Sequence, residues 1–282
     1  MRIAVLLLLL TTSVFAADTE VKISYATPRV GDKTVRSVQN EMSVKLTITG
    51  GERAFTKAYA LEETTRVAIT VLDAGKVAAT KIQVQYLKDD HKSTTPEGSA
   101  RTSQIVEGQS YIVANTRTGK EVYLPGEKQY APIDAAEIVL MDFAELGRMP
   151  RISALFANKV FTIGKTIEVP GKAAQGLFSD AGTLTGLTVA LREVKKELGV
   201  DVAIFDVAVN FERRDGYLIY TAPLKGEIAV AVNSALPVRL SVSGELKASG
   251  TKAAEGLLPE KKADGTGTMK YVLTNELTPG AK

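Results

Sequence analysis

The sequence predicts a mainly β fold of the α+β class, with a large antiparallel sheet framework and a short helical segment in the middle of the chain. Three observations predict it. Apolar residues alternate with polar ones along much of the chain, turn-forming residues separate the alternating stretches, and helical spacing is concentrated between residues 131 and 182. An alternation of period two is typical of antiparallel strands that bury one face and leave the other in water.

The expected strands are defined by their apolar positions, which fall into two groups before and after the helical segment. The pair Gly50-Gly51, an Asp-Ala-Gly turn at 73–75 and an Asn-Ser turn at 233–234 separate several of them. Residues 189–198 fit a helix or a strand, and we predict a strand because the neighbouring segments are strands. The apolar positions are Val21, Ile23 and Tyr25; Met42, Val44, Leu46 and Ile48; Val67, Ile69 and Val71; Ile82, Val84 and Tyr86; Phe205, Val207, Val209 and Phe211; Ile228, Val230 and Val232; Val238, Leu240 and Val242; and Met269, Tyr271 and Leu273.

The residue pattern in the middle of the chain predicts helices and one strand. A helix is expected from Ile133 to Leu146, with Asp134 as its N-cap and Gly147 at its C-terminal end. Two shorter helices are expected at residues 151–157 and 173–178, with a strand at 166–169 between them. Two polar stretches, residues 88–101 and 255–268, predict mobile loops.

The first sixteen residues, MRIAVLLLLLTTSVFA, have the pattern of an export signal. Arg2 precedes an apolar run at 3–10, and Val14 and Ala16 supply the small residues that signal peptidase accepts at −3 and −1. The run is too short to span a membrane, so no transmembrane segment is expected after cleavage. We therefore expect a signal peptide at 1–16, an N-terminal β region at 17–130, a central helical segment at 131–182, and a C-terminal β region at 183–282 that continues the fold of 17–130.

Charge and cysteine content narrow the compartment and the partners. Lys and Arg (35) nearly balance Asp and Glu (32) without forming a basic block, so we expect neither nucleic acid nor an anionic membrane surface as a partner. The absence of cysteine excludes a lipid-anchored lipoprotein with a cysteine at its cleavage site. An exported chain without disulfides or an Asn-X-Ser/Thr sequon favours the periplasm or the exterior of a Gram-negative bacterium.

Few residues in the chain predict catalysis. His91 is the only histidine, and as a residue of a predicted charged loop it is expected to be solvated, so no transition-metal site, cofactor or histidine catalysis is predicted. Ser249 and Lys252 have the Ser-x-x-Lys spacing of a nucleophile and its base, but they follow a strand and lack companion motifs. Gly164-Lys165-Thr166 predicts a turn before a strand and not a phosphate loop, because position 159 is Lys.

Three stretches together resemble a group of known sequences: VEGQSYIV at 106–113, AEIVLMDFAELGR at 136–148 and KVFTIGKT at 159–166. In this order they resemble uncharacterised exported β-rich proteins of Gram-negative bacteria, which have no assigned activity. The resemblance implies the compartment and the fold, and it brings no catalytic residues to this chain.

Three functions are compatible with the sequence. The first is a non-catalytic envelope or secreted protein with an interaction or structural role. The alternative is a periplasmic carrier of an apolar ligand, because a curved sheet partly closed by helices resembles the layout of lipid and lipoprotein carriers. A hydrolase that uses carboxylates alone ranks last. The partner is thus an envelope protein or an apolar ligand, and an unfilled apolar cavity favours the carrier. The residues expected to contact such a ligand, unless they are ordinary core, are Leu155, Phe156, Phe161, Leu177 and Phe178.

Overall fold

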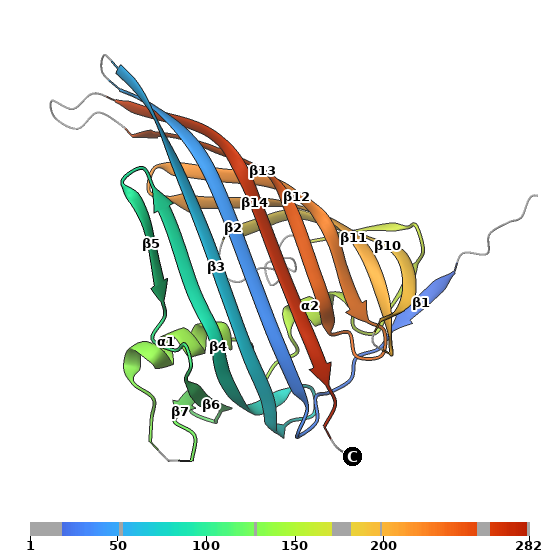
Figure 1. The fold of residues 1–282 in the computed structure, drawn as a ribbon. Coiled ribbons are helices and arrows are strands. Elements are labelled where there is room, and N and C mark those ends of the chain that lie inside the picture. The colour runs from blue at the N-terminus through green and yellow to red at the C-terminus, as the bar shows by residue number, and fades with distance from the viewer. Residues whose placement is uncertain are drawn as a thin grey trace, which may run out of the picture.

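The computed structural model describes residues 19–50, 53–126, 129–170, 182–197, 199–252 and 260–280. The proposed signal peptide and the helix expected at 173–178 lie outside these residues. Most of the described chain belongs to one antiparallel sheet of twelve strands (Figure 1). The elements are β1 (Glu20–Ile23), β2 (Lys33–Gly50), β3 (Arg53–Ala74), β4 (Ala79–Thr95), β5 (Gly98–Ser103), β6 (Ser110–Asn115), β7 (Lys120–Tyr123), α1 (Ile133–Asp142), α2 (Arg151–Phe156), β8 (Lys159–Thr162), β9 (Thr166–Val169), β10 (Thr183–Glu197), β11 (Val200–Asp215), β12 (Leu218–Ala231), β13 (Pro237–Lys252) and β14 (Lys261–Thr278).

The order of strands in the sheet differs from their order in the chain. The strands run β7-β6-β4-β3-β2-β14-β13-β12-β11-β10-β9, with β5 paired to β4, while β1 and β8 form a separate two-stranded sheet. Strand β14 lies between β2 and β13, where Thr278 stands opposite Lys33 and Lys262 stands opposite Thr49. This pairing makes one continuous sheet of the strands before and after the central segment. The expected mainly β, antiparallel fold class is confirmed.

Both helices pack on the same face of the sheet, which we call the inner face. Phe156 of α2 contacts Phe205 of β11, and the register carries the Phe205 face through Leu240 of β13 to Val38 of β2 and on across β3 to β4. Val139 and Phe143, from α1 and the residue after it, belong to a cluster on this same face of β3 and β4. Figure 1 shows the sheet bent into an open trough around these elements.

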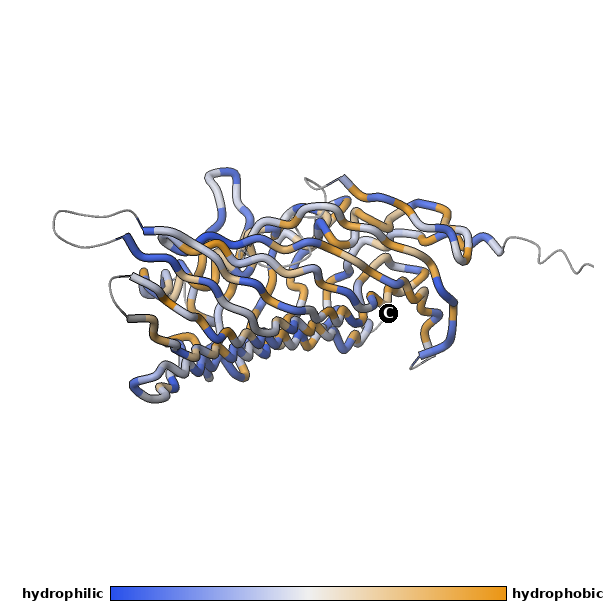
Figure 2. The backbone as a smooth tube through the Cα atoms, turned by 90° about the horizontal axis from the view of Figure 1, so that it is seen from above, coloured by the Kyte–Doolittle hydropathy of each residue, from blue (hydrophilic) through white to orange (hydrophobic). Residues whose placement is uncertain are grey.

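Apolar residues fill the inner face as the alternation predicted. Phe205, Val207, Val209 and Phe211 are all buried, and Figure 2 shows hydrophobic and hydrophilic residues alternating along the strands. The larger core lies under α2 and β8, and a smaller one lies under α1. Toward the middle of the inner face burial is less complete, and Met42 is only half-buried.

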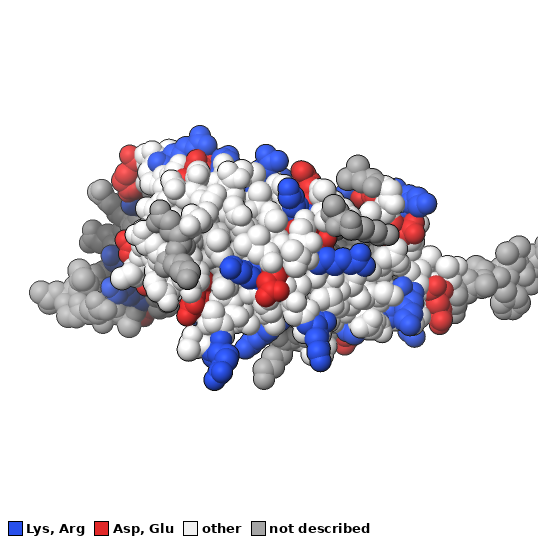
Figure 3. Space-filling model, turned by 90° about the horizontal axis from the view of Figure 1, so that it is seen from below, with Lys and Arg blue, Asp and Glu red and all other residues white. Residues whose placement is uncertain are grey.

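The outer face carries the charged positions of the same strands. Arg192 of β10 lies 2.8 Å from both Asp206 of β11 and Glu227 of β12, and Arg239 of β13 lies 2.7 Å from Glu227. Charges of both signs are also interspersed over the face shown in Figure 3. These contacts link charged residues of β10 to β13 in one network of opposite signs on the outer face.

Glycines on the inner face mark places where neighbouring strands approach closely. A Cβ atom at Gly267 of β14 would lie 1.8 Å from the carbonyl oxygen of Ser43, and one at Gly226 of β12 would lie 1.9 Å from that of Ser241. No side chain fits such a gap, so these positions require glycine. Glycine without a side chain is a common means of bending a strand sharply. The inner-face glycines thus accommodate the curvature of the sheet.

The prediction of mobile loops at residues 88–101 and 255–268 is wrong where the structure describes these residues. Residues 88–95 belong to β4 and residues 98–103 to β5, which form a hairpin with a turn at Pro96 and Glu97. In the second stretch, residues 261–268 belong to β14 and pair on both sides. Polar composition suggested loops, but cross-strand ion pairs such as Lys92 Nζ to Glu62 Oε1, at 2.8 Å, let charged residues occupy paired strands.

The first helix is shorter than expected. Helix α1 ends at Asp142, and its N-cap is Pro132, without a side-chain capping hydrogen bond, so the expected roles of Asp134 and Gly147 are wrong. Gly147 still adopts a left-handed conformation, with φ of +87°, and its amide donates to the carbonyl oxygen of Ala79 at 2.9 Å. The glycine therefore ties the turn after α1 to the sheet and does not end the helix. Helix α2 and strands β9 and β10 lie where they were predicted.

Candidate ligand cavity

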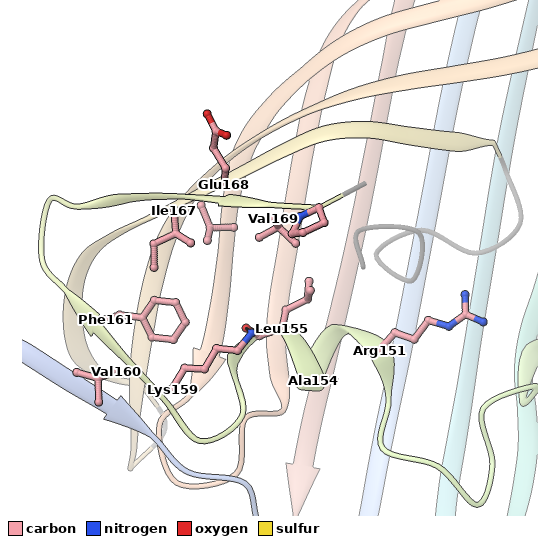
Figure 4. A pocket seen from close by; sticks show the side chains of 11 residues that line it. Arg151, Ala154, Leu155, Lys159, Val160, Phe161, Ile167, Glu168 and Val169 are labelled. Carbon is pink, nitrogen blue, oxygen red and sulfur yellow. Dashed lines mark hydrogen bonds between the residues drawn. The ribbon is translucent and has the colours of Figure 1, made fainter. Parts of the chain in front are cut away.

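A cavity of about 540 Å³ lies between α2 and β8 on one side and β9 and β10 on the other (Figure 4). This volume is within the range of small-molecule sites, roughly 300–1,000 Å³. Eight of its eleven lining residues are apolar. The lining residues are Arg151, Ala154, Leu155, Lys159, Val160, Phe161, Ile167, Glu168, Val169, Pro170 and Val189.

The first wall of the cavity is a helix followed by a tight reversal. Helix α2 begins after Pro150, whose lack of an N–H does not harm a helix start, and Asn158 turns the chain with φ of +59°. Strand β8 then returns alongside β1, where Phe161 stands opposite Val21. This local path places Ala154 of α2 and Phe161 of β8 in the same wall.

The second wall comes from the edge of the large sheet. Strand β9 pairs with β10, with Ile167 opposite Val189 and Val169 opposite Leu187. Alternation along β9 directs Ile167 and Val169 into the cavity, while Figure 4 shows Glu168 pointing away from it. The second wall therefore presents apolar side chains to the cavity and keeps the carboxylate of Glu168 outside it.

The residues predicted to contact an apolar ligand have different positions. Leu155 and Phe161 line the cavity. Phe156 lies beneath it, 1% exposed, with its ring centroid 4.8 Å from that of Phe205 and 5.8 Å from that of Phe161. Leu177 and Phe178 lie outside the described residues.

Sequence reasoning missed the other lining residues, chiefly Ala154, Ile167, Val169 and Val189. The alternation of residues 166–169 predicted the strand that carries two of them. It did not predict that this strand would face α2, because that depends on pairing between β9 and β10.

Two cations lie at the cavity and differ in their partners. The Nε atom of Arg151 is 2.9 Å from Oε1 of Glu145. The Nζ atom of Lys159 donates a hydrogen bond to the carbonyl oxygen of Leu155 at 2.8 Å, and among the described residues no carboxylate oxygen lies within 4 Å of it. Lys159 thus carries a positive charge at the wall without an acidic partner in the part of the chain that the structure describes.

A second group of polar residues lies on the inner face near α1, and it corrects the prediction for His91. This histidine belongs to β4 and not to a solvated loop. Its Nδ1 atom is 3.5 Å from Oε1 of Glu63, and its Nε2 atom is 3.4 Å from Oδ1 of Asp89. Asp89 is only 4% exposed and accepts a hydrogen bond from Thr65 at 3.1 Å. The cluster is a network of one imidazole and two carboxylates.

Burial makes the Asp89 carboxyl a source of pH-dependent stability. Desolvation raises its pKa above the ordinary 3.8, although the hydrogen bond from Thr65 and the charge of His91 oppose the shift. The folded chain therefore holds this proton more tightly than the unfolded chain. The resulting stabilisation is complete below pH 3.8 and is lost as the pH rises through the raised pKa.

We expect Asp89→Asn to remove this component. The measured quantity is the difference in unfolding free energy between the wild type and the variant, obtained by urea denaturation at a series of pH values. The wild type should lose stability relative to the variant as the pH rises from below 3.8 through the raised pKa of Asp89. Asp264→Asn, at an exposed position of β14, is the matched control and should track the wild type. A difference between wild type and Asp89→Asn that is constant with pH would contradict the prediction.

The other candidate motifs adopt geometries without catalytic use. Ser249 and Lys252 lie three residues apart on β13 in unbroken register, so their side chains point to opposite faces. Gly164 and Lys165 form the turn before β9, as predicted. Within the described ranges, no group of three or more His, Cys, Asp or Glu residues is placed to hold a metal ion. None of the helices that the structure describes is long and apolar enough to cross a membrane.

Comparisons with known proteins give no family for this chain. No protein-family model matches it, and no curated protein matches it in sequence. Among solved structures it is similar to lipovitellin, described for its lipid-protein interactions, at 10% identity and a TM-score of 0.40, over 90% of this chain but only 26% of that one. It is also similar to a DUF1329 family protein from Desulfovibrio piger, at 12% identity, a TM-score of 0.15, and 87% and 85% coverage.

A third similar structure is a putative outer membrane lipoprotein-sorting protein domain from Vibrio parahaemolyticus, at 11% identity and a TM-score of 0.13, over 89% of this chain and 87% of that one. All three TM-scores are below 0.5, so these likenesses support no functional argument. The function of the chain has to be argued from its own cavity.

Proposed function

We propose that this protein is an exported, non-catalytic carrier that binds an apolar ligand in the cavity between α2 and β9. The observation that carries the proposal is a cavity of about 540 Å³ whose lining is mainly apolar and whose walls come from the sheet edge and from α2 with β8. An apolar ligand that covers the apolar surface still exposed in the cavity lowers the free energy by removing that surface from water. Export rests on the signal pattern at residues 1–16.

The alternative, an interaction or structural protein, is less well supported. That role favours a filled core and a flat exposed sheet, whereas the described sheet is bent around α2 (Figure 1). It also leaves an unfilled cavity at its edge. The polar groups at the cavity are two cations and one carboxylate that points away, which is a poor set for hydrolysis but suits the orientation of a bound molecule.

Ala154→Trp tests the proposal by filling the cavity. Ala154 is exposed on α2 and lines the cavity, so the indole replaces the ligand without displacing core residues. We expect a neutral naphthylamine dye to bind at least about tenfold more weakly, while the unfolding free energy changes by less than about 0.5 kcal/mol. Fluorescence titration and thermal unfolding measure the two quantities.

Ala144→Trp is the control, because Ala144 is also exposed but lies just after α1 and away from the cavity. It should leave dye binding unchanged. Native mass spectrometry of the wild type purified from its own host provides a second readout, and we expect a co-purifying lipid. A wild type that binds no dye and carries no lipid would exclude the carrier and leave the interaction role.

A further inference from the structure

The cavity has one polar feature that an entirely apolar ligand would not use. The Lys159 ammonium is held at the end of α2 by its hydrogen bond to the carbonyl oxygen of Leu155, and both residues line the cavity. An ammonium group has three donors, so two remain after this bond. The helix thus fixes a lysine charge beside apolar side chains.

The other charged residues at the cavity do not neutralise Lys159. Glu168 points away in Figure 4 and forms no ion pair with Lys159. Arg151 is held by Glu145, which also accepts a hydrogen bond from the Arg151 amide at 3.0 Å. Within the described residues that line the cavity, Lys159 is therefore the cation whose charge is available to a ligand.

We propose that the ligand is a single-chain amphiphile with an anionic head group. Its chain packs against Leu155, Phe161 and Ile167, and its head accepts hydrogen bonds from the Lys159 ammonium. This assignment rests on the proposed carrier function and adds the chemical class of the ligand. A volume of about 540 Å³ suits one chain. The lysine ammonium is a compact charge without a fixed donor geometry, so it can bind a carboxylate or a phosphate head group equally well.

A pair of probes with the same tail separates the head group from the chain. Delipidated protein is titrated with oleate and with oleyl alcohol, each below the concentration at which it aggregates. We expect the wild type to bind oleate about tenfold more tightly, which corresponds to one charge-assisted contact. Added salt should weaken the binding of oleate and leave that of oleyl alcohol unchanged.

Substitution of the lysine locates the effect. Lys159→Gln should weaken the binding of oleate about tenfold, to the affinity measured for oleyl alcohol. The affinity for oleyl alcohol should not change. Lys159→Arg should retain the preference for oleate. Lys165→Gln removes the same charge from the exposed turn before β9, which does not line the cavity, and should behave as the wild type.

The outcomes separate this inference from the proposed function. Equal affinity of the wild type for both probes, or equal weakening of both by Lys159→Gln, would overturn the anionic head group and leave the carrier intact. Failure of the wild type to bind either probe would overturn the carrier itself. If Lys159→Gln does not fold, the Lys159→Arg variant and the salt dependence of the wild type decide between the two results.

Discussion

Gly267→Ala is expected to destabilise the protein by more than about 3 kcal/mol, the largest effect of any single methyl group that we predict. The added Cβ would lie 1.8 Å from the carbonyl oxygen of Ser43 and 2.7 Å from the Cα of Val44. Both are backbone atoms of β2, so no side-chain rotation relieves the clash. The pairing of β14 with β2 must open at this point, and chemical denaturation measures the loss.

Gly75→Ala provides the matched control for this substitution. Gly75 follows β3, and the nearest atom to its added Cβ is a side-chain methyl of Thr80 at 3.2 Å, which can give way. We expect a change of less than about 1 kcal/mol there. An unchanged denaturation midpoint for Gly267→Ala would show that the bend in the sheet does not depend on the missing side chain.

Phe205→Ala is expected to lower the free energy of unfolding by about 3–5 kcal/mol, because it leaves a cavity in the core instead of creating a clash. Phe205 is fully buried, and its ring centroid lies 4.8 Å from that of Phe156 and 4.9 Å from that of Phe161. Its removal leaves α2 and β8 without the sheet residue on which both aromatic rings rest. Urea denaturation measures the effect, and the variant should still fold because no atoms clash.

Phe55→Ala controls for the chemistry of the substitution. Phe55 of β3 is 45% exposed, so its truncation should cost less than about 1 kcal/mol. Equal losses in the two variants would mean that the aromatic cluster under α2 is not a distinct source of stability.

Sequence patterning predicts a strand well when the two faces of that strand differ. From Phe205 onward the strand alternates because one face meets the helices and the other carries Asp206 and Asn210, which are exposed, and all four of its predicted core residues are buried. Before Phe205 the alternation is lost, because Val202 and Ile204 of the outer face are also buried, in a small cluster with Ala229. Strand β4 beyond Tyr86 has polar residues on both faces, with His91 on the inner face and Lys92 on the outer. Period two in hydrophobicity therefore vanishes there, although the pairing continues.

The candidate cavity was partly predictable for a similar reason. Leu155 and Phe161 are large apolar residues close together in the chain, so their contribution to one wall was visible locally. The opposite wall depends on the pairing of β9 with β10, which the order of residues does not reveal. The role of Lys159 could not be predicted from the sequence, because a single lysine belongs to no motif. Its position at the cavity depends on the hydrogen bond that its ammonium donates to the carbonyl oxygen of Leu155.

The central place of β14 also determines when the sheet can form during synthesis. Ser43 and Thr268 are 225 residues apart in the chain, yet their hydroxyl oxygens are 3.0 Å apart across β2 and β14. Until residues 261–278 have been made, β2 and β13 each have a long unpaired edge, which is a template for aggregation. Contacts between such distant segments form slowly. The nascent chain therefore reaches its native sheet only after residues 261–278 have left the ribosome.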